Sequence, residues 1–236
     1  MLRMGLGERV SLCSTAYSLL VVCLVGSAPA AGLKWTHFTI ADALPGSAWG
    51  TGGIPLADFD GDGDLDVVVS RREPQTAYWF ERREDAAWIR HTMGRSEGLA
   101  RALGAAALDI NDDGRLDVVL NEVWFENPGG LADDSDKPWP AYSFPGGGHD
   151  IIAADINGDG HLDIVTYHGT VVSWFDPSSG MSRTDIGEGD QNHGGIAPNG
   201  AGDLDGDGDA DVVVPKYWFE NPGSPGGNWR RHEWPH

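Results

Sequence analysis

The feature that most constrains this chain is a nine-residue, aspartate-rich segment that occurs four times. Each copy has Asp at positions 1, 5 and 9 and Gly at position 6. The copies span residues 58–66, 109–117, 155–163 and 203–211, so they start 51, 46 and 48 residues apart. A repeat at this spacing indicates an architecture of successive similar units, and any fold for the chain has to place the four segments in equivalent positions.

Each segment lies within the same series of short β-type runs. A run of mostly small residues precedes it, a Val/Ile-rich run follows, and a third run holds a Trp-Phe pair before an acid. The predicted first strands are 54–59, 105–110, 151–156 and 200–204, and the second strands are 65–70, 116–120, 162–167 and 210–215. The third are 77–81, 123–126, 171–176 and 217–220, and the fourth are 88–93, 139–144, 181–186 and 229–234. Such units predict an all-β chain with about four propeller blades, each a four-stranded antiparallel sheet.

A further strand-like run at 35–40 bears on how the blades are arranged. It resembles a fourth strand, which a ring normally uses to close a blade whose first three strands come from the far end of the chain. No such three strands follow Trp234. Either the chain is a partial or truncated ring, which we favour, or four blades close tightly and the extra strand packs elsewhere. An open ring would leave unpaired edges and an apolar blade face, which favour self-association.

The Trp-Phe pairs predict how neighbouring blades pack. Successive residues of a strand point to opposite faces, so the two rings of a pair cannot lie on one face. We therefore expect one ring of each pair to pack against the preceding blade and the other against the following blade.

The aspartate segments have the ligand chemistry of a calcium site. Carboxylate oxygens at positions 1, 3, 5 and 9, with the position 7 backbone carbonyl, can surround one Ca²⁺ ion. An EF-hand is excluded because position 12 is Val69, Leu120, Thr166 or Val214 rather than Glu. The alternative is that the segments are Asp/Gly turns without metal. The predicted ligands are Asp58, Asp60, Asp62, Asp64, Asp66, Asp109, Asn111, Asp113, Arg115, Asp117, Asp155, Asn157, Asp159, His161, Asp163, Asp203, Asp205, Asp207, Asp209 and Asp211, of which Asp64, Arg115, His161 and Asp209 would use their carbonyl oxygens.

These residues resemble a known family. The loops, followed by Leu-Asp-Val-Val at 65–68 and 116–119 and accompanied by Tyr-Trp-Phe-Glu-Asn-Pro-Gly at 217–223, are similar to the FG-GAP or VCBS-type repeat of integrin α-subunit propellers and secreted bacterial proteins. The resemblance extends over nearly all of 35–236. It implies a propeller with Ca²⁺ in the loops between first and second strands. It does not fix an activity, because this scaffold serves adhesion, carbohydrate binding and some sugar lyases and dehydratases.

The N-terminus and the net charge indicate the location of the protein and one class of partner that it does not bind. Residues 1–30 contain two arginines, an apolar run and Ala28-Pro29-Ala30, which predict a signal peptide cleaved after Ala30 and an extracellular or periplasmic protein. The repeats would then occupy 31–236, with no membrane span in the mature chain. The formal net charge of −20 argues against nucleic acid as a partner.

A ligand would bind on the face opposite the calcium loops, where fourth strands lead into the next first strands. The preferred function is a binding or adhesion module for a glycan or an extracellular protein. The alternative is a metal-dependent sugar lyase, dehydratase or isomerase on that face. Its candidate catalytic residues are His149, Glu188, Asp190 and His193, which would have to converge on one pocket.

Overall fold

The computed structural model describes residues 36–41, 43–46, 51–83, 87–189, 194–224 and 226–234. All strands lie in one compact unit, Thr39–His236, and the account below concerns that unit. No helix in the described part of the chain is long and apolar enough to cross a membrane. The single described helix is the short 3-10 segment η1, Glu97–Leu99.

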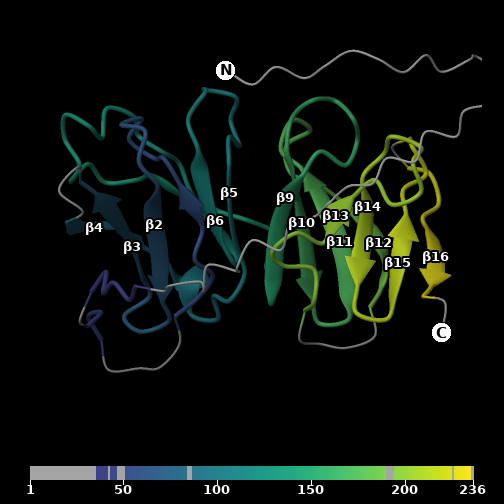
Figure 1. Ribbon diagram of the computed structural model, residues 1–236, viewed down its shortest axis with the longest axis horizontal. Coiled ribbons are helices and arrows are strands. Elements are labelled where there is room, and N and C mark those ends of the chain that lie inside the picture. The colour runs from purple at the N-terminus through teal and green to yellow at the C-terminus, as the bar shows by residue number, and fades with distance from the viewer. Residues whose placement is uncertain are drawn as a thin grey trace, which may run out of the picture. The chain divides into compact units, whose positions relative to one another are not determined.

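The sixteen strands form four separate four-stranded antiparallel sheets, each following chain order (Figure 1). Sheet one consists of β1 (Leu56–Ala57), β2 (Asp66–Arg71), β3 (Thr76–Arg82) and β4 (Trp88–Arg95). Sheet two consists of β5 (Ala105–Leu108), β6 (Asp117–Leu120), β7 (Val123–Phe125) and β8 (Ala141–Ser143). Sheet three consists of β9 (Asp150–Ala154), β10 (Asp163–His168), β11 (Val171–Asp176) and β12 (Ser182–Glu188). Sheet four consists of β13 (Ala201–Gly202), β14 (Asp211–Val214), β15 (Tyr217–Glu220) and β16 (Arg230–Glu233). The prediction of an all-β chain with four propeller blades is confirmed.

The first strands are shorter than the sequence predicted. The expected 54–59 and 200–204 reduce to the two-residue strands β1 and β13. At the second loop position, the N–H of Phe59 donates to the Asp66 carboxylate at 3.1 Å and that of Leu204 to Asp211 at 2.9 Å. These donors are used by the loops and not by a neighbouring strand, so the ladders end early.

The predicted strand at 35–40 is wrong for the residues that the structure describes, since 36–40 form no strand and Phe38 is 73% exposed. Trp35 lies outside the described residues. Each sheet already has its own fourth strand, so none offers the vacant edge that such a strand would fill. In the described ranges no strand of sheet one pairs with a strand of sheet four, and no closure of the blades by shared strands is found.

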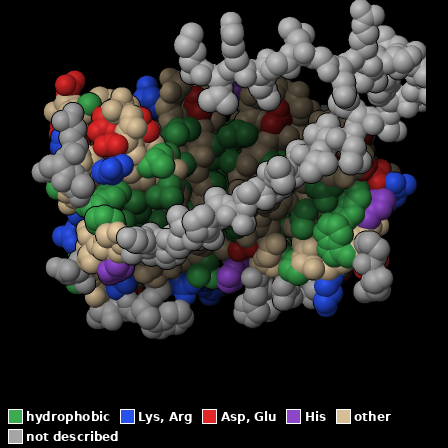
Figure 2. All heavy atoms as spheres, in the orientation of Figure 1, with side chains coloured by type: hydrophobic (Ala, Val, Ile, Leu, Met, Phe, Trp, Pro, Cys, Tyr) green, Lys and Arg blue, Asp and Glu red, His purple; other side chains and the backbone are tan. Residues whose placement is uncertain are grey.

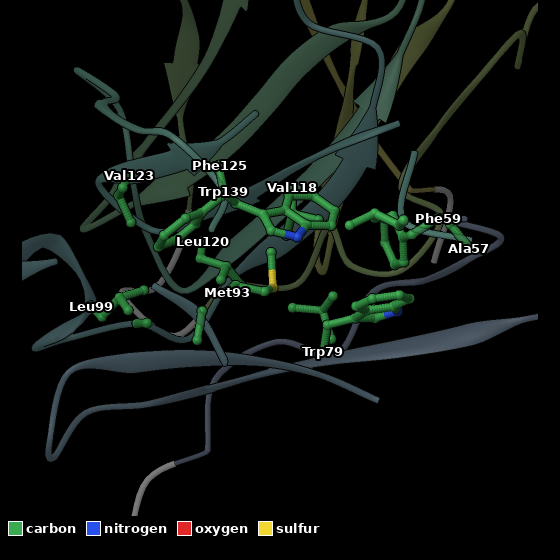
Figure 3. Close-up of a cluster of buried hydrophobic side chains, with 14 residues drawn as sticks. Ala57, Phe59, Trp79, Met93, Leu99, Val118, Leu120, Val123, Phe125 and Trp139 are labelled. Carbon is green, nitrogen blue, oxygen red and sulfur yellow. The ribbon is translucent and has the colours of Figure 1, made fainter. Parts of the chain in front are cut away.

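Three apolar clusters hold neighbouring sheets together, and the Trp-Phe pairs supply both sides of them. Trp79 of sheet one and Phe125 of sheet two meet in the first cluster, which Figure 3 shows with Met93 and Trp139. Trp124 packs on the cluster between sheets two and three, where Phe175 lies. Trp174 joins the cluster between sheets three and four. The expected arrangement, with one ring on each side of a sheet, is confirmed for sheets two and three.

The innermost strands pass close to one another, which explains their small residues. A Cβ atom on Gly104 would lie 2.6 Å from Ile151 Cγ1 and 2.7 Å from the Ile151 nitrogen. The Gly104 N–H also donates to the carbonyl oxygen of Gly148 at 3.2 Å. Larger residues at this position would force sheets two and three apart.

Candidate metal loops and ligand cavities

Each aspartate segment forms a turn that its own carboxylates organise. In the first, Asp58 accepts the N–H groups of Gly61 at 2.8 Å and Gly63 at 2.9 Å. Asp60 accepts the N–H of Asp62 at 3.1 Å, and Asp62 accepts that of Asp64 at 2.8 Å. The other three segments repeat the bond from the position 6 Gly to the position 1 Asp. The turn is therefore a property of the repeat.

Position 9 differs from the other acids because it is buried. Asp66, Asp117, Asp163 and Asp211 are at most 2% exposed. Burial raises the pKa of Asp117 to about 6 and that of Asp163 to about 7, and it raises the pKa of Asp66 and Asp211 as well. A carboxylate removed from water is costly unless a positive charge or hydrogen bonds compensate it. These four positions need such compensation.

The compensation that the chain provides is unequal between repeats. The Asp66, Asp117 and Asp211 carboxylates each accept a second backbone N–H, from Arg82 at 2.9 Å, Asn127 at 2.7 Å and Asn221 at 2.8 Å respectively. The equivalent residue of the third repeat is Pro177, which has no N–H to donate. Asp163 consequently lacks this bond, and its pKa is raised by its burial and by the nearby Asp176 carboxylate.

Two asparagines, which the sequence pattern did not predict as site residues, connect successive loops. Asn127 is 1% exposed, and its Nδ2 donates to the Phe59 carbonyl in the preceding loop at 2.9 Å. Asn221 is 5% exposed and donates in the same way to the Ile156 carbonyl at 2.8 Å. Both follow a Trp-Phe-Glu run and precede Pro-Gly, and this shared context is the signal that could have identified them.

The acidic groups fit a hard cation. Among the described residues, Asp58, Asp60 and Asp62 form one cluster that could hold a metal ion, and Asp203, Asp205 and Asp211 form another. In both, the possible ligand atoms lie within 4.8 Å of one another. The second and third loops have Asn at position 3, and in the second the Arg115 guanidinium contacts the Asp113 carboxylate. Oxygen donors of this kind suit Ca²⁺, and the loops with Asn carry less negative charge.

A cavity of about 700 Å³ lies among the first strands of the four repeats. Its lining includes Ile54 and Leu56, which are 56% and 60% exposed, and His149 at its rim. Figure 2, in the orientation of Figure 1, shows hydrophobic side chains at the surface of the face in view. The cavity is thus largely apolar, with few polar groups.

The structure describes two of the four candidate catalytic residues, His149 and Glu188. His149 Nδ1 lies 3.1 Å from Asp150 Oδ1 on the cavity rim. Asp150 itself accepts the N–H groups of Ile196 at 2.8 Å and Ala197 at 3.1 Å, and also that of Gly195. These bonds hold the pKa of the Asp150 carboxyl below its usual value despite its burial. Its role is to fix the loop that leads to sheet four.

Glu188 ends β12 with an exposed side chain and is not among the residues that line the 700 Å³ cavity. Asp190 and His193 lie outside the described residues. The metal-capable clusters found in the described ranges contain neither His149 nor Glu188. The catalytic hypothesis therefore stays a prediction.

Comparison with protein families identifies one segment. Residues 58–120 match the family described as FG-GAP-like repeat. These residues are an FG-GAP-like repeat segment. The match runs from the first position of the first loop to the end of β6, so it includes the loops 58–66 and 109–117 with the strands between them.

The third and fourth loops lie outside the matched residues and share with the first loop the bond from the position 6 Gly to the position 1 Asp. A comparison with curated proteins finds no match. Among solved structures, one similar chain is a lectin from Agrocybe aegerita, described by its specific recognition of non-reducing terminal N-acetylglucosamine, with 19% identity and a TM-score of 0.49. Another is the rhamnogalacturonan lyase YesW, with 12% identity and a TM-score of 0.40. The alignments cover 77% and 74% of this chain but only 52% and 41% of those chains.

Proposed function

We propose that this chain is a secreted, calcium-binding repeat protein that acts as a binding or adhesion module for a glycan or another extracellular protein. The observation that carries the proposal is the buried acid at the end of each loop. Four such acids, at most 2% exposed, lie beside further carboxylates of the same loops. Bound Ca²⁺ would supply the positive charge that these groups lack.

The residues that would hold the ion are those the sequence predicted. In the first loop, Asp58, Asp60 and Asp62 present carboxylate oxygens close together, and the buried Asp66 ties the loop to β3 through the Arg82 N–H. The loop hydrogen bonds orient these carboxylates in advance. Because Asp66 joins the loop to the sheet, a Ca²⁺ ion bound in the loop would also stabilise the sheet.

A rigid scaffold with an accessible cavity suits binding better than catalysis. The 700 Å³ cavity carries exposed apolar side chains, and Asp150 beside His149 is engaged by backbone N–H groups. The net charge of −20 disfavours nucleic acid. The signal-peptide pattern of residues 1–30, and the absence of cysteine after Cys23 in the sequence, accord with an exported protein stabilised by metal in place of disulfides.

Thermal unfolding with calcium, with excess EDTA and with calcium restored tests this proposal. An ion that binds only the folded state contributes about 2.7 kcal/mol for each site at a hundredfold excess over its Kd. With several sites, we expect EDTA to lower the midpoint strongly and reversibly. The double variant Asp203→Asn with Asp205→Asn should reduce this calcium-dependent shift.

The matched control is Asp133→Asn, an exposed acid outside the loops, which should leave the shift unchanged. An unfolding midpoint that is the same in calcium and in EDTA, together with no calcium in elemental analysis, would refute the proposal. The aspartate segments would then be turns without metal.

A further inference from the structure

A second, smaller cavity lies between sheets two and three. Its volume is about 280 Å³, and it is lined by the β6–β7 turn at Glu122, the 145–147 segment and the facing strands β10 and β11. The strands β6 and β10 both begin at an aspartate loop and run away from it. The cavity lining therefore extends from Glu122 and His168, at the ends of β6 and β10 away from the loops, to Phe175 and Arg183, which lie beside the start of β10.

The cavity exists because the third repeat departs from the others at two paired positions. In each sheet, one residue near the end of the second strand faces one near the start of the third strand. The equivalent pairs are Val69 with Tyr78, Leu120 with Val123, Thr166 with Ser173, and Val214 with Tyr217. Three of the pairs fill their space with aliphatic or aromatic groups. In sheet three both residues are small and carry hydroxyl groups, which leaves space between the sheets.

The polar lining is organised before any ligand binds. Thr166 and Ser173 are each 2% exposed. Ser173 Oγ donates to Asp185 Oδ1 at 2.9 Å, and Arg183 Nε donates to the same oxygen at 2.7 Å. The carboxylate therefore fixes a hydroxyl and a guanidinium together at one side of the cavity. Buried hydroxyl groups are costly in an apolar interface unless they are hydrogen-bonded, and the bond to Asp185 compensates the Ser173 hydroxyl.

The charges at the cavity indicate the chemistry of a ligand. Arg183 offers further N–H donors, Glu122 and His168 offer oxygen and nitrogen atoms, and all three are exposed at the rim. The Arg183 charge is paired with the Asp185 carboxylate, and Glu122 adds a second negative charge, which does not favour phosphate. Several donors and acceptors around a small space match a neutral molecule with many hydroxyl groups.

We propose that the cavity between sheets two and three binds one sugar unit of a glycan. This inference assigns a partner class and a binding site to the proposed function. It rests on that function only because the sheets that form the cavity must be folded. The small side chains of Thr166 and Ser173 would leave space for the sugar ring, and Arg183 and Glu122 would form hydrogen bonds with its hydroxyl groups.

The test is saturation-transfer NMR of the calcium-loaded protein with a panel of methyl glycosides of neutral hexoses and N-acetylhexosamines. The main variant is Thr166→Leu with Ser173→Val, which installs the pair that sheet two already packs as Leu120 and Val123. It should fill the cavity and abolish the sugar signal. Arg183→Ala should weaken binding by about tenfold, a common result of losing a hydrogen bond from a charged group.

The matched control is Arg90→Ala. Arg90 faces Phe80 across β3 and β4 as Arg183 faces Phe175 across β11 and β12, but it does not line this cavity. It should leave binding unchanged. No signal from any glycoside with the unsubstituted protein, or an unchanged signal in the double variant, would overturn the inference. The calcium-dependent midpoint is measured in parallel, so an unsubstituted protein that keeps its calcium shift but binds no glycoside refutes this site alone. A double variant that loses the sugar signal and keeps its calcium shift supports the site.

Discussion

Replacing Asn127 by alanine tests how the repeats are held together. Its amide donates to the Phe59 carbonyl at 2.9 Å and the Leu116 carbonyl at 3.2 Å, and its Oδ1 accepts the Gly129 N–H at 2.9 Å. The residue is 1% exposed, so water cannot replace these partners. Asn127→Ala removes all three bonds at once and leaves a buried carbonyl of the preceding loop without its donor.

The size of the effect follows from these contacts. Each net hydrogen bond contributes about 1 kcal/mol, and leaving a buried group unpaired adds about 1–3 kcal/mol. We therefore expect Asn127→Ala to lower the free energy of unfolding by about 4–6 kcal/mol. With a urea dependence of about 1–3 kcal/mol per molar, the midpoint would fall by roughly 1 M or more.

Urea unfolding in saturating calcium measures this change, and Arg82→Ala is the control. Arg82 occupies the same place in sheet one, and its backbone N–H keeps the bond to Asp66 after substitution. Its side chain makes only a partly exposed ion pair with Asp64 at 3.1 Å, worth about 1 kcal/mol at most. If the two variants shift the midpoint equally, the inter-repeat bond to Phe59 does not stabilise the fold and the reasoning is wrong.

Two further predictions concern the sheets themselves. Trp79 is fully buried between sheets one and two, so Trp79→Ala should lower the free energy of unfolding by about 3–5 kcal/mol. Trp218 is only half-buried and stacks on His232, so Trp218→Ala should lower it clearly less. Equal urea midpoints for the two variants would contradict the assigned packing. The Asp150 carboxyl has a lowered pKa in the folded state, so its stabilisation is present above the unfolded-state value of about 3.9 and is lost as the pH falls through the folded pKa. The melting midpoint of Asp150→Asn should therefore lie below that of the unsubstituted protein at neutral pH and approach it in acid, and a constant difference would refute this.

The sequence predicted most of the fold because the information repeats within it. Four Asp/Gly turns between β-type runs defined the four meanders, and the Trp-Phe alternation predicted which faces meet. It failed where a residue's partner is not local. The first strands end early because the N–H of Phe59 bonds a carboxylate seven residues away. The strand predicted at 35–40 required a sheet that lacks its fourth strand, and each of the four described sheets has its own.

The sites were predicted to different extents for the same reason. Metal ligands within one nine-residue loop can be read directly from their spacing. The bond from Asn127 to Phe59 spans 68 positions, so the shared Trp-Phe-Glu-Asn-Pro-Gly context can identify the asparagine but not its partner. The cavity required the register of β10 with β11, since Thr166 and Ser173 are unremarkable until their equivalents in the other sheets are known.

The interface between sheets two and three differs from its neighbours in two independent ways. Between sheets one and two, and between three and four, an asparagine links the loops. Pro177 occupies that place in the third repeat, and the loops are instead joined by an exposed contact between His161 and Asp112 at 2.7 Å, which contributes little in water. The same interface has hydroxyl groups at the cavity where the others have apolar packing, while the N–H of Gly104 donates to the Gly148 carbonyl and that of Gly148 to Asn121 Oδ1 across it. A sugar bound in the cavity would add contacts at the position where the apolar pair of the other sheets is missing, so sugar binding should stabilise the interface between sheets two and three.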